Sequence, residues 1–195
     1  MFEEILKLDS KLFLFLNNLG TSRFDTFWIS LSKIEANILM YLFLIFLFFY
    51  IQNFRPKFLN ILYLLFVIAL MITITDQGAN YFKDSFQRLR PCYNESLMDS
   101  LRLVKENCGG KYGFFSAHAS NSFSLAIFFG LLFKNKIRYM FIITMAYASL
   151  ISYSRIYLGV HFPIDIIVGG SFGITVGLIT YSFLYLKFLK FFDEA

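Results

Sequence analysis

The residues with the clearest chemistry lie in the stretch SRIYLGVHFPID, residues 154–165, where Arg155, His161 and Asp165 stand at the start of an apolar segment. Charged side chains at the end of a membrane-length apolar run are costly unless they are paired or functional. Asp165 comes one helical turn after His161 if a helix begins near Pro163. The carboxylate can then hold one ring N–H of His161 and leave the other ring nitrogen free as a nucleophile.

Upstream lie several residues of the types that bind and cleave phosphate groups: Lys83, Arg90, Ser116, Ala117 and His118. The cations can bind phosphoryl oxygens, while one histidine attacks phosphorus and the other protonates the leaving oxygen. The chain contains two histidines, and one of them is better suited as a nucleophile than as a ligand, so a metal site is the weaker alternative. We therefore expect phosphoryl chemistry without a metal or other cofactor.

Composition places these residues in a bilayer. Hydrophobic residues make up 57% and aromatic residues 21% of the 195 residues, and the mean hydropathy is +0.61. Such a chain is too apolar for a soluble domain and leaves room for five or six membrane helices, so we expect one all-α membrane domain over residues 1–195. The net charge of +5 comes from basic residues at the ends of apolar runs, which favours lipid head groups over nucleic acid as partners.

The apolar pattern divides the chain into predicted segments. Residues 1–20 begin with acidic residues and carry a short apolar run, which favours an interfacial helix over a signal peptide or a span. The predicted spans are 36–51, with a possible extension back past Trp28, then 58–82, 116–133, 137–153 and 164–189. Residues 84–115 form the longest polar stretch and are the expected extramembrane loop.

If the spans alternate in direction, the end of the second, the start of the third, the end of the fourth and the start of the fifth share one membrane face. Every candidate residue lies at one of these four places: Lys83, Arg90, Ser116, Ala117, His118, Arg155, His161 and Asp165. The sequence therefore predicts a single phosphate site on one face of the membrane.

Other polar and aromatic residues have simpler interpretations. Asp76, Asn80 and Lys83 follow an i, i+4, i+7 pattern, so Asp76 is either a supporting residue of the site or part of a polar helix end. Glycines along the fifth span favour close helix packing: Gly169, Gly170, Gly173 and Gly177. Four further cations are expected to be solvated or lipid-facing: Arg88, Arg102, Lys105 and Lys111. Three aromatic residues are expected at the membrane interface: Trp28, Tyr153 and Tyr157.

Both cysteines, Cys92 and Cys108, fall in the polar loop. If the loop faces an oxidising compartment they can pair, which would stabilise the fold by about 3 kcal/mol and restrain Arg90. The alternative is two unpaired thiols. Basic residues are divided almost evenly between the two faces once Lys83, Arg90 and Arg155 are set aside as substrate ligands, so the cysteines are the better guide and favour an outward-facing site.

Three motifs carry a resemblance to a known family. KDSFQRLRP at residues 83–91, FSAH at residues 115–118 and SRIYLGVHFPID resemble the motifs KxxxxxxRP, PSGH and SRxxxxxHxxxD of the type 2 phosphatidic acid phosphatase family. The first and third match at every fixed position. In the second, Phe115 stands where proline is usual and Ala117 where glycine is usual, which puts the turn geometry and the rate in doubt more than the reaction class.

The resemblance implies a metal-independent lipid phosphatase with a phosphohistidine intermediate. His161 then resembles the nucleophile, Asp165 its orienting acid and His118 the general acid. Residues that resemble the phosphate ligands are Lys83, Arg90, Ser116 and Arg155, with a backbone N–H contributed by Ala117. It also implies a bacterial inner membrane protein with its site facing the periplasm.

The compact form resembles bacterial undecaprenyl-diphosphate phosphatases and lipid A 1-phosphatases. Phosphatidylglycerol phosphate and phosphatidic acid stay open as substrates, as does the oligomeric state. A lipid phosphotransferase would use the same histidine, and a lipid-binding or transport protein that kept the fold without the reaction is the alternative from another class.

Overall fold

The computed structural model describes residues 2–51, 58–105 and 107–186, and the regular elements in these ranges are helical. The α-helices are α1 (Phe2–Asn18), α2 (Asp25–Ser32), α3 (Ile34–Ile51), α4 (Phe58–Phe86), α5 (Ala117–Phe133), α6 (Met140–Tyr157) and α7 (Pro163–Ile179). Short 3-10 helices follow at η1 (Ser22–Phe24), η2 (Pro91–Tyr93) and η3 (Glu95–Leu97), and α7 continues into a π-helical segment, η4 (Thr180–Tyr185). The expected all-α fold is confirmed.

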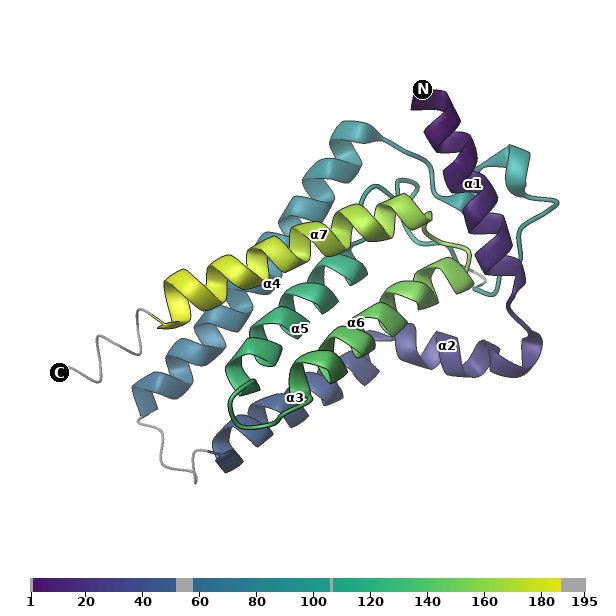
Figure 1. Ribbon diagram of the computed structural model, residues 1–195. Helices are drawn as coiled ribbons and strands as arrows, with labels where there is room; N and C mark the ends of the chain where they lie inside the picture. Colours follow the sequence, from purple (N-terminus) through teal and green to yellow (C-terminus); the bar gives the residue numbers. More distant parts are fainter. Residues whose placement is uncertain (1, 52–57, 106, 187–195) are drawn as a thin grey trace.

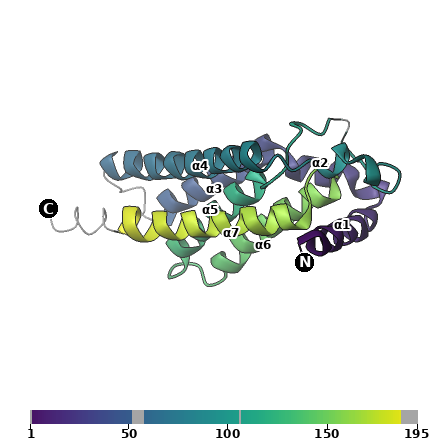
Figure 2. The same ribbon diagram turned by 90° about the horizontal axis from the view of Figure 1, so that it is seen from above.

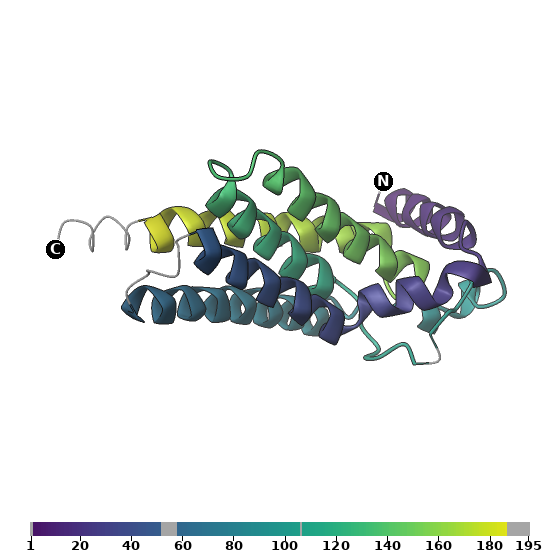
Figure 3. The same ribbon diagram turned by 90° about the horizontal axis from the view of Figure 1, so that it is seen from below.

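The helices α3 to α7 form an elongated bundle, and α1, α2 and the loop after α4 gather at one of its ends (Figures 1 and 2). Helix α5 lies at the centre, because it contacts α4, α6 and α7. Its buried side chains include Leu125, Phe128 and Phe129, which belong to the largest hydrophobic cluster. Figure 3, the view from below, shows α2 leading into α3 along the side of the bundle that faces the viewer.

Three described helical segments are long and apolar enough to cross a membrane: 34–51, 58–86 and 163–183. In the chain, two further helices lie between α4 and α7: α5, which is apolar but shorter, and α6, which has 18 residues. Large apolar side chains such as Leu39, Phe43 and Phe66 are exposed on the outside of the bundle, as expected for surfaces that face lipid. The five helices α3 to α7 correspond in order to the five predicted spans.

Several predicted boundaries differ from the observed ones. The first span does not extend back through Trp28, because Lys33 adopts an extended conformation (ψ 143°) that separates α2 from α3. Helix α4 continues through Phe86, so the polar loop begins later than predicted. Helix α6 begins at Met140 instead of Ile137. The predicted end of the fifth span, residues 187–189, lies outside the described residues.

The glycines of α7 set the distance between α7 and α5. A Cβ atom added at Gly169, Gly173 or Gly177 would lie 2.6, 2.1 or 2.6 Å from the carbonyl oxygen of Ser116, Ser120 or Ser124, respectively. These pairs recur at intervals of one helical turn on both helices, so the two backbones approach along their whole contact. The prediction of close packing is therefore confirmed, and the helix that carries His118 is held directly against the helix that carries Asp165.

The three aromatic residues expected at the membrane interface pack against one another. Tyr157 is 2% exposed, and its hydroxyl donates to the Thr21 carbonyl or the Asp25 carboxylate at 2.7 Å. The Trp28 ring packs against the rings of Tyr153 and Tyr157 at 5.1 and 5.3 Å. The interfacial interpretation was wrong for Tyr157, because the chain before α2 folds back over the end of α6 and covers it.

Candidate functional site

The four helix ends that carry the candidate residues lie at the same end of the bundle (Figure 1). These are the end of α4, the start of α5, the end of α6 and the start of α7. Electrostatic interactions join the candidates across these ends: His161 interacts with Arg155, Arg90 and Lys83, and His118 interacts with His161. The helix ends that carry the candidate residues therefore lie together, and the roles of these residues stay predictions.

His161 lies in the short loop between α6 and α7. Gly159 has a positive φ of 80°, the conformation that commonly ends a helix and that suits glycine. Beyond it the chain turns so that the His161 backbone N–H donates to the Arg155 carbonyl at 3.3 Å. Pro163 then begins α7 and Asp165 occupies its third position, where Oδ2 accepts the Phe162 N–H at 3.0 Å. The same oxygen lies 3.4 Å from Nδ1 of His161.

The surroundings of His161 favour its neutral form. The side chain is buried, and the pKa of His161 lies well below its usual range because of this burial and, secondarily, the positive charges of Arg155, Arg90 and Lys83. A neutral imidazole has a free lone pair, which is what a histidine nucleophile requires at neutral pH.

Arg155 is buried at the end of α6 and is 5% exposed. Its Nη1 donates to the hydroxyl of Ser32, at the end of α2, while its Nε has no hydrogen-bond partner among the described residues. The backbone of Ser32 also forms a hydrogen bond with His118. An unpaired, buried guanidinium nitrogen beside two histidines is suited to receive an anionic oxygen.

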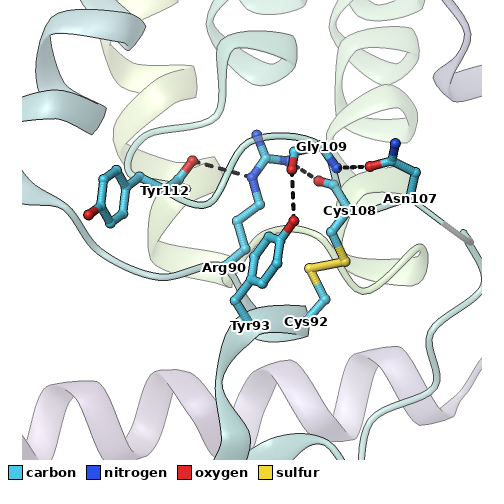
Figure 4. The surroundings of a disulfide bond; sticks show 7 residues. All are labelled: Arg90, Cys92, Tyr93, Asn107, Cys108, Gly109 and Tyr112. Atoms are coloured by element: carbon cyan, nitrogen blue, oxygen red, sulfur yellow. Dashed lines mark hydrogen bonds between the residues drawn. A yellow bond between two sulfur atoms is a disulfide. The ribbon is translucent and has the colours of Figure 1, made fainter.

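Arg90 is held by the polar loop. Its Nε donates to the Tyr112 carbonyl at 3.3 Å and its Nη1 to the Cys108 carbonyl at 3.0 Å, as Figure 4 shows. Cys92 and Cys108 form a disulfide in the structure, which closes the loop on the residue next to Pro91. Lys83, by contrast, forms one hydrogen bond with a described residue, at 3.4 Å to the side chain of Asn80, so its ammonium group has donors to spare.

Ser116 caps α5 and connects it to α7. Its Oγ accepts the Ala119 N–H at 3.4 Å, and its backbone N–H donates to the Asp165 carbonyl at 3.1 Å. Ala117 is the first residue of α5, where backbone N–H groups have no partner within the helix and attract anions. Phe115, in the position where the family has proline, is buried against Phe82 and Phe172 at 5.1 and 5.2 Å.

Two cavities border His118. One, of about 280 Å³, includes Ser32, Lys105 and Arg155 in its lining and is the more polar. The other, of about 430 Å³, is lined mainly by apolar residues of α3, α4 and α5, with Asp76 and Asn121 among them. Asp76 Oδ1 accepts the side-chain N–H of Asn121 at 3.0 Å, and Thr75 donates to the amide oxygen of Asn121. His118 thus separates a cationic space from a largely apolar one.

Two of the four cations expected to be solvated or lipid-facing form ion pairs within the protein instead. Arg88 bridges Asp9 and Asp165 at 2.5 and 2.8 Å, and Arg102 pairs with Asp25 at 2.5 Å. Lys105 borders the cationic cavity, and its pKa is lowered by partial burial and by nearby Arg155 and Arg90. Lys105 and Lys111 are both exposed, as expected. The interpretation failed for Arg88 and Arg102 because these residues match no motif and their ion-pair partners lie at least 77 residues away in the chain.

Sequence reasoning also missed Ser32 and Asp9. Ser32 lies in a segment with no chemical pattern, so nothing in the sequence marks it. Asp9 had a signal: Asp9, Phe13 and Asn17 recur every four residues, and a helix places them on one face. All three are buried in the structure. An acid and an amide that share a helix face with a buried phenylalanine indicate polar partners in the protein interior.

Comparison with known proteins agrees with this arrangement. The chain matches the PAP2 superfamily over residues 60–188. It is 37% identical over 188 residues to a lipid A 4′-phosphatase of Porphyromonas gingivalis, a match that covers 96% of this chain and 75% of that protein. It is 34% identical over 177 residues to a lipid A 4′-phosphatase of Bacteroides thetaiotaomicron, with 89% and 75% covered.

Two crystal structures share the fold. LpxE of Aquifex aeolicus aligns with a TM-score of 0.68 and 26% identity, over 89% of this chain and 94% of that one. A PAP2-type phosphatidylglycerolphosphate phosphatase of Bacillus subtilis aligns with a TM-score of 0.69 and 19% identity, over 98% and 87%, and supports the fold alone. The extent of the family match and the identity to the two relatives establish that this chain belongs to the PAP2 superfamily and is a membrane lipid phosphatase of that type.

Proposed function

We propose that this phosphatase removes a phosphate group from a lipid A-type glycolipid, with the 4′-phosphate as the first candidate, through a phosphohistidine at His161. The observation that carries the proposal is the convergence of a buried, neutral His161, three cations and a second histidine at one end of the bundle. The choice of lipid rests on the two relatives named lipid A 4′-phosphatase.

In the first step His161 attacks phosphorus. Its Nδ1–H donates to Asp165, which leaves Nε2 free to form the N–P bond as the bond from phosphorus to the lipid oxygen breaks. His118 gives its proton to that oxygen, so the lipid leaves as an alcohol. The negative charge of the phosphate lets His118 carry a proton in these cationic surroundings.

Charge on the phosphoryl oxygens is balanced by the cations throughout. Arg155, Arg90 and Lys83 supply guanidinium and ammonium donors, and the Ala117 N–H and the Ser116 hydroxyl add donors at the start of α5. In the second step water attacks the phosphohistidine, His118 takes the proton from that water, and inorganic phosphate leaves with neutral His161 restored. Metal independence follows from this scheme and stays a prediction.

The larger cavity supports a sugar as the leaving group. Because His118 protonates the leaving oxygen, the cavity on its far side is where the leaving alcohol lies. Asp76 and Asn121 there can hydrogen-bond hydroxyl and amide groups of a glucosamine, whereas a polyprenyl chain would offer them no polar group in addition to their contacts with each other and with Thr75. The apolar remainder of the lining fits acyl chains. Asp76 thus becomes a leaving-group contact as well as a neighbour of Lys83.

We place this membrane protein in the bacterial inner membrane with the site facing the periplasm. The disulfide between Cys92 and Cys108 supports this orientation, since disulfides persist in oxidising compartments. Reporter fusions test it. A fusion in residues 134–138, at the opposite end of the bundle, should report cytoplasm, and a periplasmic signal there would reverse the assignment.

The function is tested with purified protein in detergent. Lipid A bearing 1- and 4′-phosphates, undecaprenyl diphosphate and phosphatidylglycerol phosphate are offered side by side, and inorganic phosphate and product mass are measured. We expect loss of the 4′-phosphate, phosphate release abolished in His161→Asn, and a phosphorylated peptide containing residue 161 in a rapid quench. Transfer of phosphate to another lipid would indicate a phosphotransferase, and binding without turnover would indicate a non-catalytic protein.

His118 has a test of its own. His118→Ala should lose activity on lipid substrates yet retain much of its activity on p-nitrophenyl phosphate, whose leaving group departs without a proton. Equal losses on both substrates would contradict a role in protonating the leaving oxygen.

A further inference from the structure

The carboxylate of Asp165 divides its two oxygens between different partners. Oδ2 accepts the Phe162 N–H at 3.0 Å and lies 3.4 Å from Nδ1 of His161. Oδ1 accepts a hydrogen bond from Nη1 of Arg88 at 2.8 Å. Asp165 is fully buried, so a second oxygen without a donor would be strongly unfavourable. Arg88 therefore fixes the plane of the carboxylate that faces His161.

Arg88 is itself held from the other side. Its Nη2 donates to Oδ2 of Asp9 at 2.5 Å, and its guanidinium lies over the Phe162 ring at 4.2 Å from the centroid. The side chains of Asp9 and Asp165 are 1% and 0% exposed, while that of Arg88 is 19% exposed. A guanidinium is rigid and planar, so one group can engage two carboxylates at fixed angles, which an ammonium group cannot do.

Asp9 brings helix α1 into this arrangement. Its second oxygen accepts the Ile164 N–H at 2.9 Å, a first-turn amide of α7 that has no partner within the helix. One turn further along α1, the ring of Phe13 packs against that of Phe162 at 5.3 Å. Two turns along, the side-chain amide of Asn17 lies 3.0 Å from the carbonyl oxygens of Ile156 and Tyr157. Helix α1 is thus attached to both ends of the loop that carries His161.

Another face of α1 carries exposed apolar side chains, Leu8, Leu12 and Phe15. This face suits the membrane surface, while the Asp9 face is committed to the site. One short helix therefore connects the lipid surface to the loop between α6 and α7.

We propose that Arg88 is a positioning residue of the reaction: held by Asp9 of α1, it orients the Asp165 carboxylate and so fixes the ring of His161 for attack. This inference rests on the proposed function, because it assigns Arg88 a part in forming the phosphohistidine. Both terminal nitrogens of Arg88 already engage carboxylates, so Arg88 does not serve as a phosphate ligand like Arg90 or Arg155.

Removing an ion pair that only stabilises the fold has different effects on stability and rate from removing one that positions a catalytic group. Loss of a structural pair lowers thermal stability and leaves the rate of the folded enzyme unchanged. Loss of a positioning pair lowers kcat with little change in KM, because the phosphate ligands remain in place. Arg102 is the matched control: it forms an arginine–aspartate pair with Asp25 near the same end of the bundle and does not contact Asp165.

The experiment compares Arg88→Ala, Arg88→Lys, Asp9→Asn and Arg102→Ala in detergent, with p-nitrophenyl phosphate and the lipid substrate. We expect kcat to fall about 10²-fold in Arg88→Ala, with KM changed by less than about threefold. Arg88→Lys should recover part of the loss, and Asp9→Asn, which keeps an acceptor for Arg88, should lose about tenfold or less. Arg102→Ala should lower thermal stability and keep kcat. An unchanged kcat in folded Arg88→Ala, or an equal loss in Arg102→Ala, overturns the proposal.

A second readout does not depend on activity. The chain contains two histidines, so ¹⁵N-histidine NMR resolves one imidazole in the site loop and one in α5. Wild type should show His161 with its proton fixed on Nδ1, and Arg88→Ala should lose this signature while the His118 signals stay in place. If wild type released no phosphate from any substrate but the NMR change occurred, the proposed function would fail while the positioning role of Arg88 stood. If the His161 signals were identical in both proteins, the positioning role itself would fail.

Discussion

The close contact between α5 and α7 allows one substitution to be worked through in detail. In Gly173→Ala the new Cβ would lie 2.1 Å from the carbonyl oxygen, 2.9 Å from the carbonyl carbon and 3.0 Å from the Cα of Ser120. All three are backbone atoms, so no side-chain rotation relieves the overlap. Helix α7 must move away from α5 by roughly 1 Å to restore van der Waals contact.

This displacement affects both stability and activity. Overpacking of this kind costs about 1–3 kcal/mol, which should exceed the roughly 1 kcal/mol that alanine gains over glycine within a helix. Because α5 carries His118 and α7 carries Asp165, a shift of about 1 Å also misaligns the two sides of the site and should lower kcat by up to about 10²-fold. Thermal unfolding in detergent and initial phosphate-release rates measure the two effects.

A series of substitutions makes the test quantitative. Gly169→Ala and Gly177→Ala meet backbone carbonyls at 2.6 Å, so each should destabilise less than Gly173→Ala. Gly169 lies one turn from Asp165, so its substitution should reduce kcat more than that of Gly177. Gly110→Ala is the control, since nothing lies within 4 Å of the added Cβ. Wild-type stability and activity in Gly173→Ala would refute the claim that this contact sets the geometry of the site.

Three further predictions concern the loop residues and Arg155. The pKa of His161 is depressed by burial and by neighbouring cations, so the folded state resists protonation and stability is lost as pH falls from about 6.5 toward the folded pKa. The thermal midpoint of the wild type should therefore decrease as the pH is lowered from 7.5 to 5.5, and that of His161→Asn should decrease less. Equal decreases in the two proteins would contradict this. Replacing Cys92 and Cys108 by serine should lower the free energy of unfolding by about 3 kcal/mol, and it should raise KM because Arg90 is less restrained. An unchanged KM would show that Arg90 is held without the disulfide. Ser32→Ala removes the hydroxyl that accepts a hydrogen bond from Arg155 and should lower kcat/KM about tenfold. Steady-state kinetics measure this effect, and Ser30→Ala on the same helix is the control.

Much of this fold could be predicted because the bilayer imposes a simple rule. Apolar runs of about twenty residues must form helices, so the segments around Phe43, Phe66 and Phe128 were recognisable from composition. Alternation of spans then predicted Lys83, His118, Arg155 and His161 at one end, because each span that crosses the membrane must be followed by one that crosses back. The break at Lys33 escaped prediction, since a single extended residue between two helical segments leaves no mark in hydropathy.

The sequence by itself determined the spans, the two candidate histidines and the face that they share, because these depend on residue type and local spacing. Only the tertiary structure decided which charges have partners. Arg88 reaches Asp9 across 79 residues of chain and Asp165 across 77, and Arg155 reaches Ser32 across 123. Contacts of this kind depend on how α1 and α2 fold back over the loop between α6 and α7, and local periodicity carries no information about that packing.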